Sequence, residues 1–137
     1  MGDYMFMLEN RLGAEQFRVL GQVQKLATDA GYGVYLTGSA MRDMLGGFPV
    51  RELHFTVEGN ALKLAKALEK AGASIVGTDD WRKALEVRFG PVGIKIATAH
   101  TEKYAKSGAK PQIAPSPIRE HLQSRDFTIN AIALSLN

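Results

Sequence analysis

Hydrophobic residues recur at helical spacing in two long stretches of the chain. Between residues 14 and 30, apolar side chains three or four apart predict a helix that stops at Gly31. A second stretch, introduced by Asn60 as the capping residue, predicts a helix over 60–72. The apolar positions are Phe17, Leu20, Val23 and Leu26 in the first stretch, and Leu62, Leu64, Ala65 and Leu68 in the second.

Shorter apolar runs lie between and after these helices. The runs typical of strands are 33–38, 53–57, 74–77, 84–89 and 92–98. Brief helices are predicted over 39–47, with Ser39 as N-cap, near 118–122, and over 127–136 with Asp126 as cap, and a surface loop over 105–117. This order predicts an α/β (α+β) protein with a small mixed β-sheet and helices mainly on one face.

Composition narrows the class of protein only slightly. A length of 137 residues with 45% hydrophobic and 23% charged residues fits one globular domain. The net charge of +3 is compatible with an anionic partner such as a nucleotide or RNA. The absence of cysteine excludes disulfides, thiolate catalysis and cysteine-based zinc sites. We see no signal peptide and no run long enough to span a membrane, so we expect no membrane partner and a cytoplasmic location.

The strand predicted over 53–57 carries the first candidate chemistry. Its surroundings read VRELHFTVEG, and Glu52 and His54 are two residues apart, so their side chains share one face. A carboxylate beside an imidazole could be a catalytic pair, a metal clamp or solvated surface. The residues alone leave these three interpretations open.

Three strings of sequence resemble a known family. GSAMRDMLGGFPVRELHF (38–55), IATAHTEKY (96–104) and SRDFTINAIALSL (124–136) resemble the head domain of the class II tRNA nucleotidyltransferase and bacterial poly(A) polymerase family. The resemblance runs from about residue 31 to residue 137 and implies a nucleotidyltransferase fold. We therefore expect a single head domain over 1–137, with an N-terminal extension and helix in 1–30.

The resemblance also implies a nucleotide-binding cleft, formed by the 38–43 turn, the 52–57 strand and the 125–130 segment. Matched residue by residue, the positions implied to bind nucleotide are Gly38, Ser39, Arg42, Asp43, Arg125, Asp126 and Asn130. Arg42 could instead simply pair with Asp43 or Asp126, and Asp126 could act only as a helix cap.

The positions that hold metal in the family are altered here. The family uses Mg²⁺ on two aspartates and a further acidic residue, and this chain has Glu52, His54 and Lys95 there. The charge of that set is about zero instead of near −3, so we expect no catalytic residue and no bound metal. Two further departures are His100 and His121, which stand where the family has arginine and aspartate. The histidines could form a transition-metal site with Glu52, or be polar surface that remains after metal binding was lost.

We therefore predict a catalytically inactive head domain that binds a nucleoside triphosphate or RNA, or that serves as a scaffold. The alternative is an active metal-dependent RNA nucleotidyltransferase, adding a tRNA 3′ end or poly(A) together with further domains. Trp81, beside Arg82 and Lys83, could stack on a base or pack on its own domain. The oligomeric state is not predicted.

Overall fold

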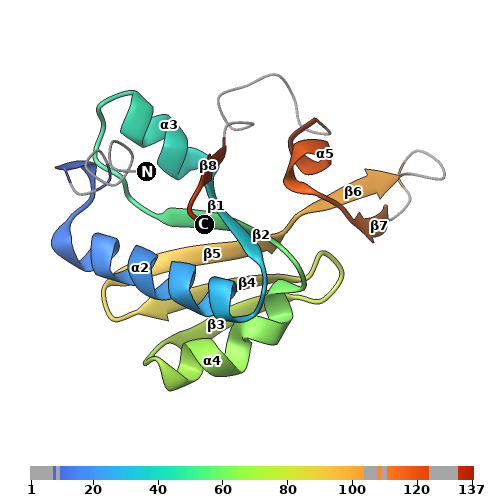
Figure 1. Cartoon of the computed structure of the whole chain (residues 1–137), viewed down its shortest axis with the longest axis horizontal. Coiled ribbons are helices and arrows are strands. Elements are labelled where there is room, and N and C mark those ends of the chain that lie inside the picture. The colour runs from blue at the N-terminus through green and yellow to red at the C-terminus, as the bar shows by residue number, and fades with distance from the viewer. Residues whose placement is uncertain (1–7, 9, 104–107, 109–110, 124–132) are drawn as a thin grey trace.

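The computed structural model describes residues 8, 10–103, 108, 111–123 and 133–137 (Figure 1). Its centre is a six-stranded sheet with the strand order β3-β4-β5-β2-β1-β8. β2 and β5 are parallel, and the other neighbours are antiparallel, so the sheet is mixed as predicted. Its strands are β1 (Gly33–Thr37), β2 (Leu53–Glu58), β3 (Ser74–Asp79), β4 (Ala84–Phe89), β5 (Val92–Thr98) and β8 (Ala133–Ser135).

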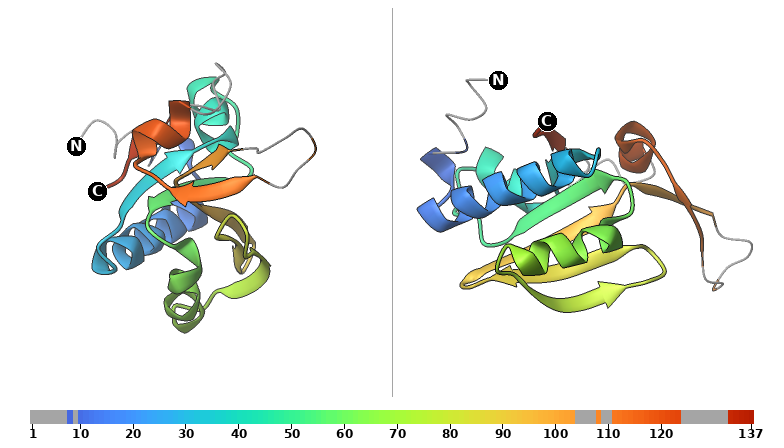
Figure 2. Two further views of the ribbon diagram at one scale, coloured as in Figure 1. Left: turned by 90° about the vertical axis from the view of Figure 1, so that its right-hand side faces the viewer. Right: turned by 60° about the horizontal axis from the view of Figure 1, so that its bottom comes forward.

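Helices lie mainly on one face of this sheet. The elements are α2 (Ala14–Asp29), α3 (Ser39–Leu45), a 3₁₀ turn η1 (Ala61–Leu64) that continues into α4 (Ala65–Lys70), and α5 (Ile118–Gln123). The views in Figures 1 and 2 place α2 and α4 side by side against the same face. A two-stranded ribbon, β6 (His100–Lys103) and β7 (Gln112–Pro115), extends from the sheet beside α5. None of the described helices is long and apolar enough to cross a membrane.

Strand alternation gives the sheet two chemically different faces. The face against α2 and α4 is the core. It carries Leu36, Phe55, Ile96 and Val87, each at most 1% exposed. The opposite face carries a row of polar residues that are register partners on successive strands. The row runs Thr37, His54, Lys95, Glu86.

Most of the predicted elements are confirmed, with small differences at helix starts. Asn60 does cap its helix, accepting a hydrogen bond from the Leu62 amide at 3.0 Å, but the first turn is a 3₁₀ turn. Ser39 is the first residue of α3, and Gly38 is the N-cap. The prediction of a serine cap was wrong because the positive φ of Gly38 already makes the turn from β1.

Two predictions near the C-terminus were wrong where the structure describes the chain. Residues 133–135 form strand β8 instead of the end of a helix, because they pair with β1 and bury Leu134 opposite Leu36. Pairing across the sheet here overrides local helix propensity. Within the predicted loop 105–117, residues 112–115 form strand β7, paired with β6. Residues 126–132 of the predicted helix lie outside the described residues.

A carboxylate attaches α5 to the sheet. Glu58 accepts a hydrogen bond from the Tyr35 hydroxyl at 3.1 Å and another from the Ile118 amide at 2.9 Å. Burial, assisted by the bond to Glu58, raises the pKa of Tyr35. This contact holds the start of α5 at the end of β2 and so positions His121 over the polar face.

Candidate functional site

A cleft opens on the polar face of the sheet, where β1 leads into α3. It is rich in imidazole and cationic groups, and none of the described residues that line it is acidic. The lining residues are Thr37, Gly38, His54, Phe55, Thr56, Arg82, Ala84, Lys95, Ala97, His100 and His121. The cleft thus lies between Gly38 of the predicted turn and the 52–57 strand, whereas the third predicted segment, 125–130, lies outside the described residues. Nucleotide binding in this cleft stays a prediction.

Gly38 is required at this position for two reasons. Its φ of 67° lies in the left-handed region, and a Cβ atom there would lie 2.9 Å from Nδ1 of His54. The turn thus lies directly against the His54 ring. Beneath it the Thr37 and Thr56 hydroxyls are hydrogen-bonded at 2.9 Å, which joins β1 to β2 at the floor of the cleft.

Glu52 and His54 share a face, as predicted, but their contact is loose. His54 Nε2 lies 3.5 Å from Glu52 Oε2, at the limit of a hydrogen bond, and both side chains are partly exposed. On the other side, His54 is the register partner of Lys95 on β5. The predicted neighbourhood of these three residues is confirmed, and it combines one carboxylate with an imidazole and an ammonium group.

Arg82 is held at the cleft by two carboxylates. Its Nε donates to Glu102 Oε1 at 2.7 Å, and its backbone amide donates to Asp79 at 2.9 Å. His100 Nε2 lies 3.2 Å from the same Glu102 oxygen. The hydrogen bond from Arg82 lowers the pKa of Glu102, helped by His100 and opposed by burial.

This role of Arg82 and Glu102 was not predicted from the sequence. A signal was present, because His100 and Glu102 are two residues apart and repeat the alternation of Glu52 and His54. It could not be read without knowing that the chain continues as strand β6 after Ala99.

The other two histidines are bound to backbone. His121 is 5% exposed, and its Nδ1 lies 3.1 Å from the His100 amide nitrogen and 2.9 Å from the His100 carbonyl oxygen. When Nδ1 of His121 is unprotonated it accepts a hydrogen bond from the His100 amide, and when it is protonated it donates one to the His100 carbonyl oxygen. His100 Nδ1 lies 2.7 Å from the Thr98 carbonyl oxygen. Among the described residues no three His, Asp or Glu side chains are placed to hold a metal ion, so the transition-metal interpretation finds no site there.

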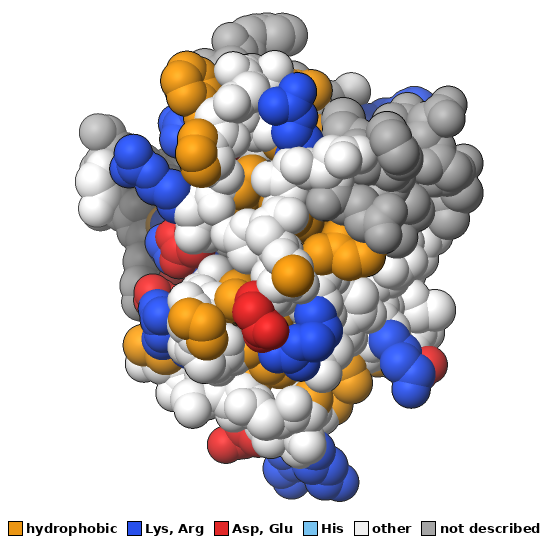
Figure 3. All heavy atoms as spheres, turned by 90° about the vertical axis from the view of Figure 1, so that its left-hand side faces the viewer, with side chains coloured by type: hydrophobic (Ala, Val, Ile, Leu, Met, Phe, Trp, Pro, Cys, Tyr) orange, Lys and Arg blue, Asp and Glu red, His pale blue; other side chains and the backbone are white. Residues whose placement is uncertain are grey.

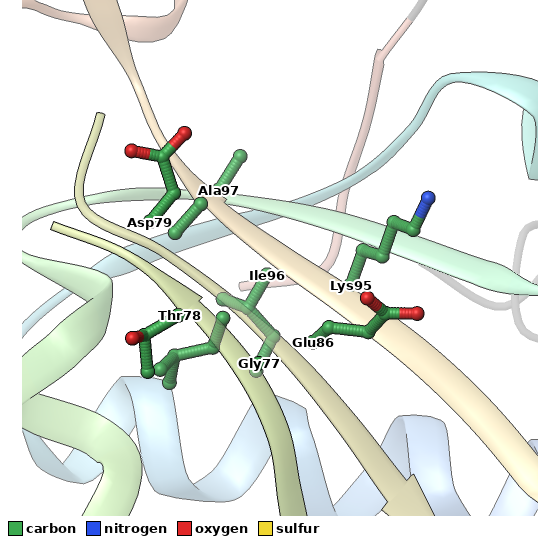
Figure 4. Close-up of a pocket in the computed structure, with 9 residues that line it drawn as sticks. Gly77, Thr78, Asp79, Glu86, Lys95, Ile96 and Ala97 are labelled. Carbon is green, nitrogen blue, oxygen red and sulfur yellow. The ribbon is translucent and has the colours of Figure 1, made fainter. Parts of the chain in front are cut away.

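The polar face continues beyond the cleft toward the edge strand β3. A neighbouring depression shares Lys95, Ala84 and Ala97 with the cleft and also contains Asp79 and Glu86. Figure 4 shows Glu86 and Lys95 side by side on neighbouring strands. Positive charge therefore lies nearer Gly38, and negative charge nearer β3.

The remaining predicted residues lie elsewhere. Arg42 and Asp43 line a separate depression with Phe48, and they pair at 3.6 Å, as the simpler interpretation of Arg42 expected. Ser39 begins α3 directly after the cleft glycine. Arg125, Asp126 and Asn130 lie outside the described residues. Trp81 donates from Nε1 to the Pro111 carbonyl at 2.9 Å and remains 43% exposed.

Glu52, His54 and Lys95 do not fit the magnesium ion that the resemblance implies. Mg²⁺ takes oxygen ligands in octahedral geometry, and the set offers one carboxylate. The imidazole of His54 lies beside the Glu52 carboxylate, and Lys95, with its ammonium group, is the register partner of His54. No catalytic step through a metal is therefore derived for these residues.

Residues 34–137 match the family described as poly A polymerase head domain. An A-adding tRNA nucleotidyltransferase of Aquifex aeolicus is 39% identical over 75% of this chain, which covers 12% of that protein. A solved structure of a CCA-adding enzyme in its apo form II is 33% identical, with a TM-score of 0.83 over 96% of this chain and 31% of the other.

A second solved structure is a tRNA nucleotidyltransferase complexed with a primer tRNA and an incoming ATP analogue. It is 32% identical, with a TM-score of 0.65 over 84% of this chain and 31% of the other. The chain thus spans about a third, or less, of the length of these proteins.

Proposed function

Because the chain belongs to the poly A polymerase head domain family of class II tRNA nucleotidyltransferases, we propose that it is a catalytically silent head domain. Its cleft binds the phosphates of a nucleoside triphosphate, or of an RNA end, without a metal ion. The observation that carries this proposal is the lining of the cleft. It presents Lys95, Arg82 and three histidines, and no carboxylate among the described lining residues.

The chemistry of these groups suits phosphate. Ammonium and guanidinium groups form charge-assisted hydrogen bonds to phosphate oxygens, and imidazole can donate one as well. Arg82 is already oriented by Glu102, so little side-chain freedom is lost when it meets an anion. The solved relative with a bound ATP analogue supports the same class of ligand for the family.

The same groups oppose nucleotidyl transfer. That reaction depends on metal ions that neutralise the triphosphate and activate the attacking hydroxyl. The resemblance matches His54 and Lys95 to metal-binding acids of the family, and the charge of Lys95 repels a divalent cation. The relatives are much longer chains, so their activity as whole enzymes is not compared with this chain. The proposal that this chain is inactive rests on the residues of the cleft alone.

The activity test uses labelled ATP or CTP, a tRNA that lacks its 3′ end, and either magnesium or manganese. We expect no incorporation above a blank without protein. The A-adding relative serves as the positive control. Incorporation by this chain would overturn the silent interpretation and favour the alternative of an active, metal-dependent enzyme.

The binding test is calorimetric titration with ATP, with and without magnesium. We expect binding without magnesium and no gain when it is added, because the metal masks the charge that Lys95 and Arg82 would meet. Adenosine, which lacks phosphate, is the matched ligand control and should not bind. Absence of heat and of any thermal shift at millimolar ATP would leave only the scaffold interpretation.

A further inference from the structure

The turn after α3 holds an aromatic ring on the surface. The Gly47 amide donates to the Met44 carbonyl at 3.3 Å, and the Phe48 amide donates to the Asp43 carbonyl at 2.8 Å. With the φ of 76° at Gly47, these bonds form a Schellman motif. The residue in the position of Phe48 commonly packs its apolar side chain back onto the helix. Phe48 instead is 65% exposed, although its backbone is fixed.

One part of the Phe48 ring is supported and the rest is open. A Cβ atom built on Gly46 would lie 2.9 Å from two ring carbons, so the ring rests against the backbone of Gly46. The support restricts the ring without covering it. A fixed aromatic ring that is accessible to solvent is a ready platform for stacking.

Cationic side chains surround this ring. Arg42 and Arg51 line the same depression as Phe48 and Pro49, and both arginines are exposed. The acid in this described lining is Asp43, which is engaged by Arg42 at 3.6 Å. On the side of the molecule that carries the loop between α3 and β2, Figure 3 shows hydrophobic side chains interspersed with Lys and Arg.

An aromatic platform with flanking arginines matches the chemistry of unpaired nucleic acid, in which flat bases alternate with anionic phosphates. We propose that Phe48 stacks on an unpaired base of a single-stranded RNA and that Arg42 and Arg51 contact its phosphates. The inference goes beyond the proposed function and does not depend on nucleotide binding in the cleft. α3 has seven residues and is therefore about 10 Å long, so the two sites lie at opposite ends of one short helix.

The test measures binding of a fluorescent, unstructured RNA of about 12 nucleotides by anisotropy. Phe48→Ala should weaken binding about tenfold, and Phe48→Trp should restore it, because stacking contributes on that scale. Leu45→Ala is the matched control. Leu45 is 52% exposed near the same turn but does not line the depression, so its removal should leave the affinity unchanged.

Salt dependence tests the phosphate contact separately. Arg51→Gln should weaken binding and reduce the slope of log affinity against log salt by about 0.7, the value for one phosphate contact on a single strand. The duplex of the same sequence should bind more weakly than the single strand, because its bases are not available to stack.

Several outcomes would overturn the inference. One is an RNA affinity unchanged in Phe48→Ala, with circular dichroism confirming that the variant is folded. Another is duplex binding as tight as single-strand binding. A third is that Phe48→Ala abolishes self-association in sedimentation and leaves RNA affinity unchanged, which would make the surface a protein contact. Phe48→Ala should weaken RNA binding by the same factor in the Lys95→Ala background, where the cleft is altered. The test of the Phe48 site therefore stays valid even if the cleft does not bind ATP.

Discussion

The two faces of the central sheet come from the same strands and have different roles. On β2, the side chain of Phe55 packs in the core and is 1% exposed, whereas the side chain of its neighbour His54 is partly exposed at the cleft. The same alternation on β5 buries Ile96 and presents Lys95. Because alternate residues face opposite ways, a substitution on one face leaves the packing of the other in place.

This separation means that residues on the polar face can change while the fold is kept. The core face needs apolar side chains of the right volume. The polar face needs only to be compatible with solvent and with its neighbours, so residues such as His54 and Lys95 can be substituted there without loss of a core contact. The comparison predicts that stability and ligand binding respond to different sets of residues.

The largest expected effect is on the core face. Phe55→Ala should lower the free energy of unfolding by about 3 to 5 kcal/mol, because it removes a fully buried ring and leaves a cavity. His54→Ala, the adjacent residue on the opposite face, should change it by less than about 1 kcal/mol. Urea unfolding followed by circular dichroism measures both. Equal losses would contradict the separation of the two faces.

The next effect is a gain of metal binding on the polar face. Glu52→Asp, His54→Asp and Lys95→Asp together should raise Mn²⁺ affinity about a hundredfold, because three carboxylates replace a set of near-zero charge. Calorimetry with manganese measures the change. Asparagine at the same three positions is the matched control, with similar side chains and no charge. Undetectable manganese binding by the aspartate variant would show that these positions do not form the family's metal site.

A smaller effect is expected on ATP affinity. Lys95→Ala should weaken ATP binding about tenfold, since it removes one charge-assisted hydrogen bond to phosphate. Lys95→Arg should retain most of the affinity. Lys95 is exposed, so the free energy of unfolding should remain close to that of the wild type. An unchanged ATP affinity in Lys95→Ala would place the phosphates elsewhere.

The smallest expected effect is the pH dependence of stability through Glu102. The folded state lowers the pKa of this carboxyl from its usual 4.5. Its stabilising contribution is therefore present above that pH and is lost as the pH falls through the lower folded value. Glu102→Gln should reduce the melting temperature slightly at about pH 7, and the difference should shrink near pH 3.

Thermal unfolding at the two pH values measures the effect of Glu102→Gln. Glu86→Gln is the control, because Glu86 is an exposed acid on the central sheet and forms no ion pair with any residue that the structure describes. A Glu102→Gln difference that stays constant with pH would mean that charge on Glu102 does not stabilise the fold.

Much of the fold could be predicted because its elements carry strong local signals. The helical spacing in residues 14–30 and the strand-type runs at 84–89 and 92–98 are properties of the chain itself, and all became the expected elements. The strand at 133–135 could not be predicted locally. Its apolar residues also fit a helix, and only pairing with β1 selects the extended form.

The site likewise has residues that could be grouped from the sequence and residues that could not. Glu52 and His54 could be placed on one face from their spacing, and the resemblance added Lys95 to them. The grouping of Arg82 with Glu102 and His100 could not be foreseen, because these residues come from the turn before β4 and from β6. Arg42 was expected in the cleft, yet the direction of α3 carries it to the other depression with Phe48.

The sequence by itself determined the residue types and their local order: a carboxylate at Glu52, an imidazole at His54 and an ammonium group at Lys95. These follow from single positions and from short-range periodicity. Only the tertiary structure decided which of these groups share a cleft and which of them have partners. It brings residues from distant strands into register, and it sends the two ends of α3 to different surfaces. Contacts between residues far apart in the chain depend on packing of the whole sheet, which no local pattern encodes.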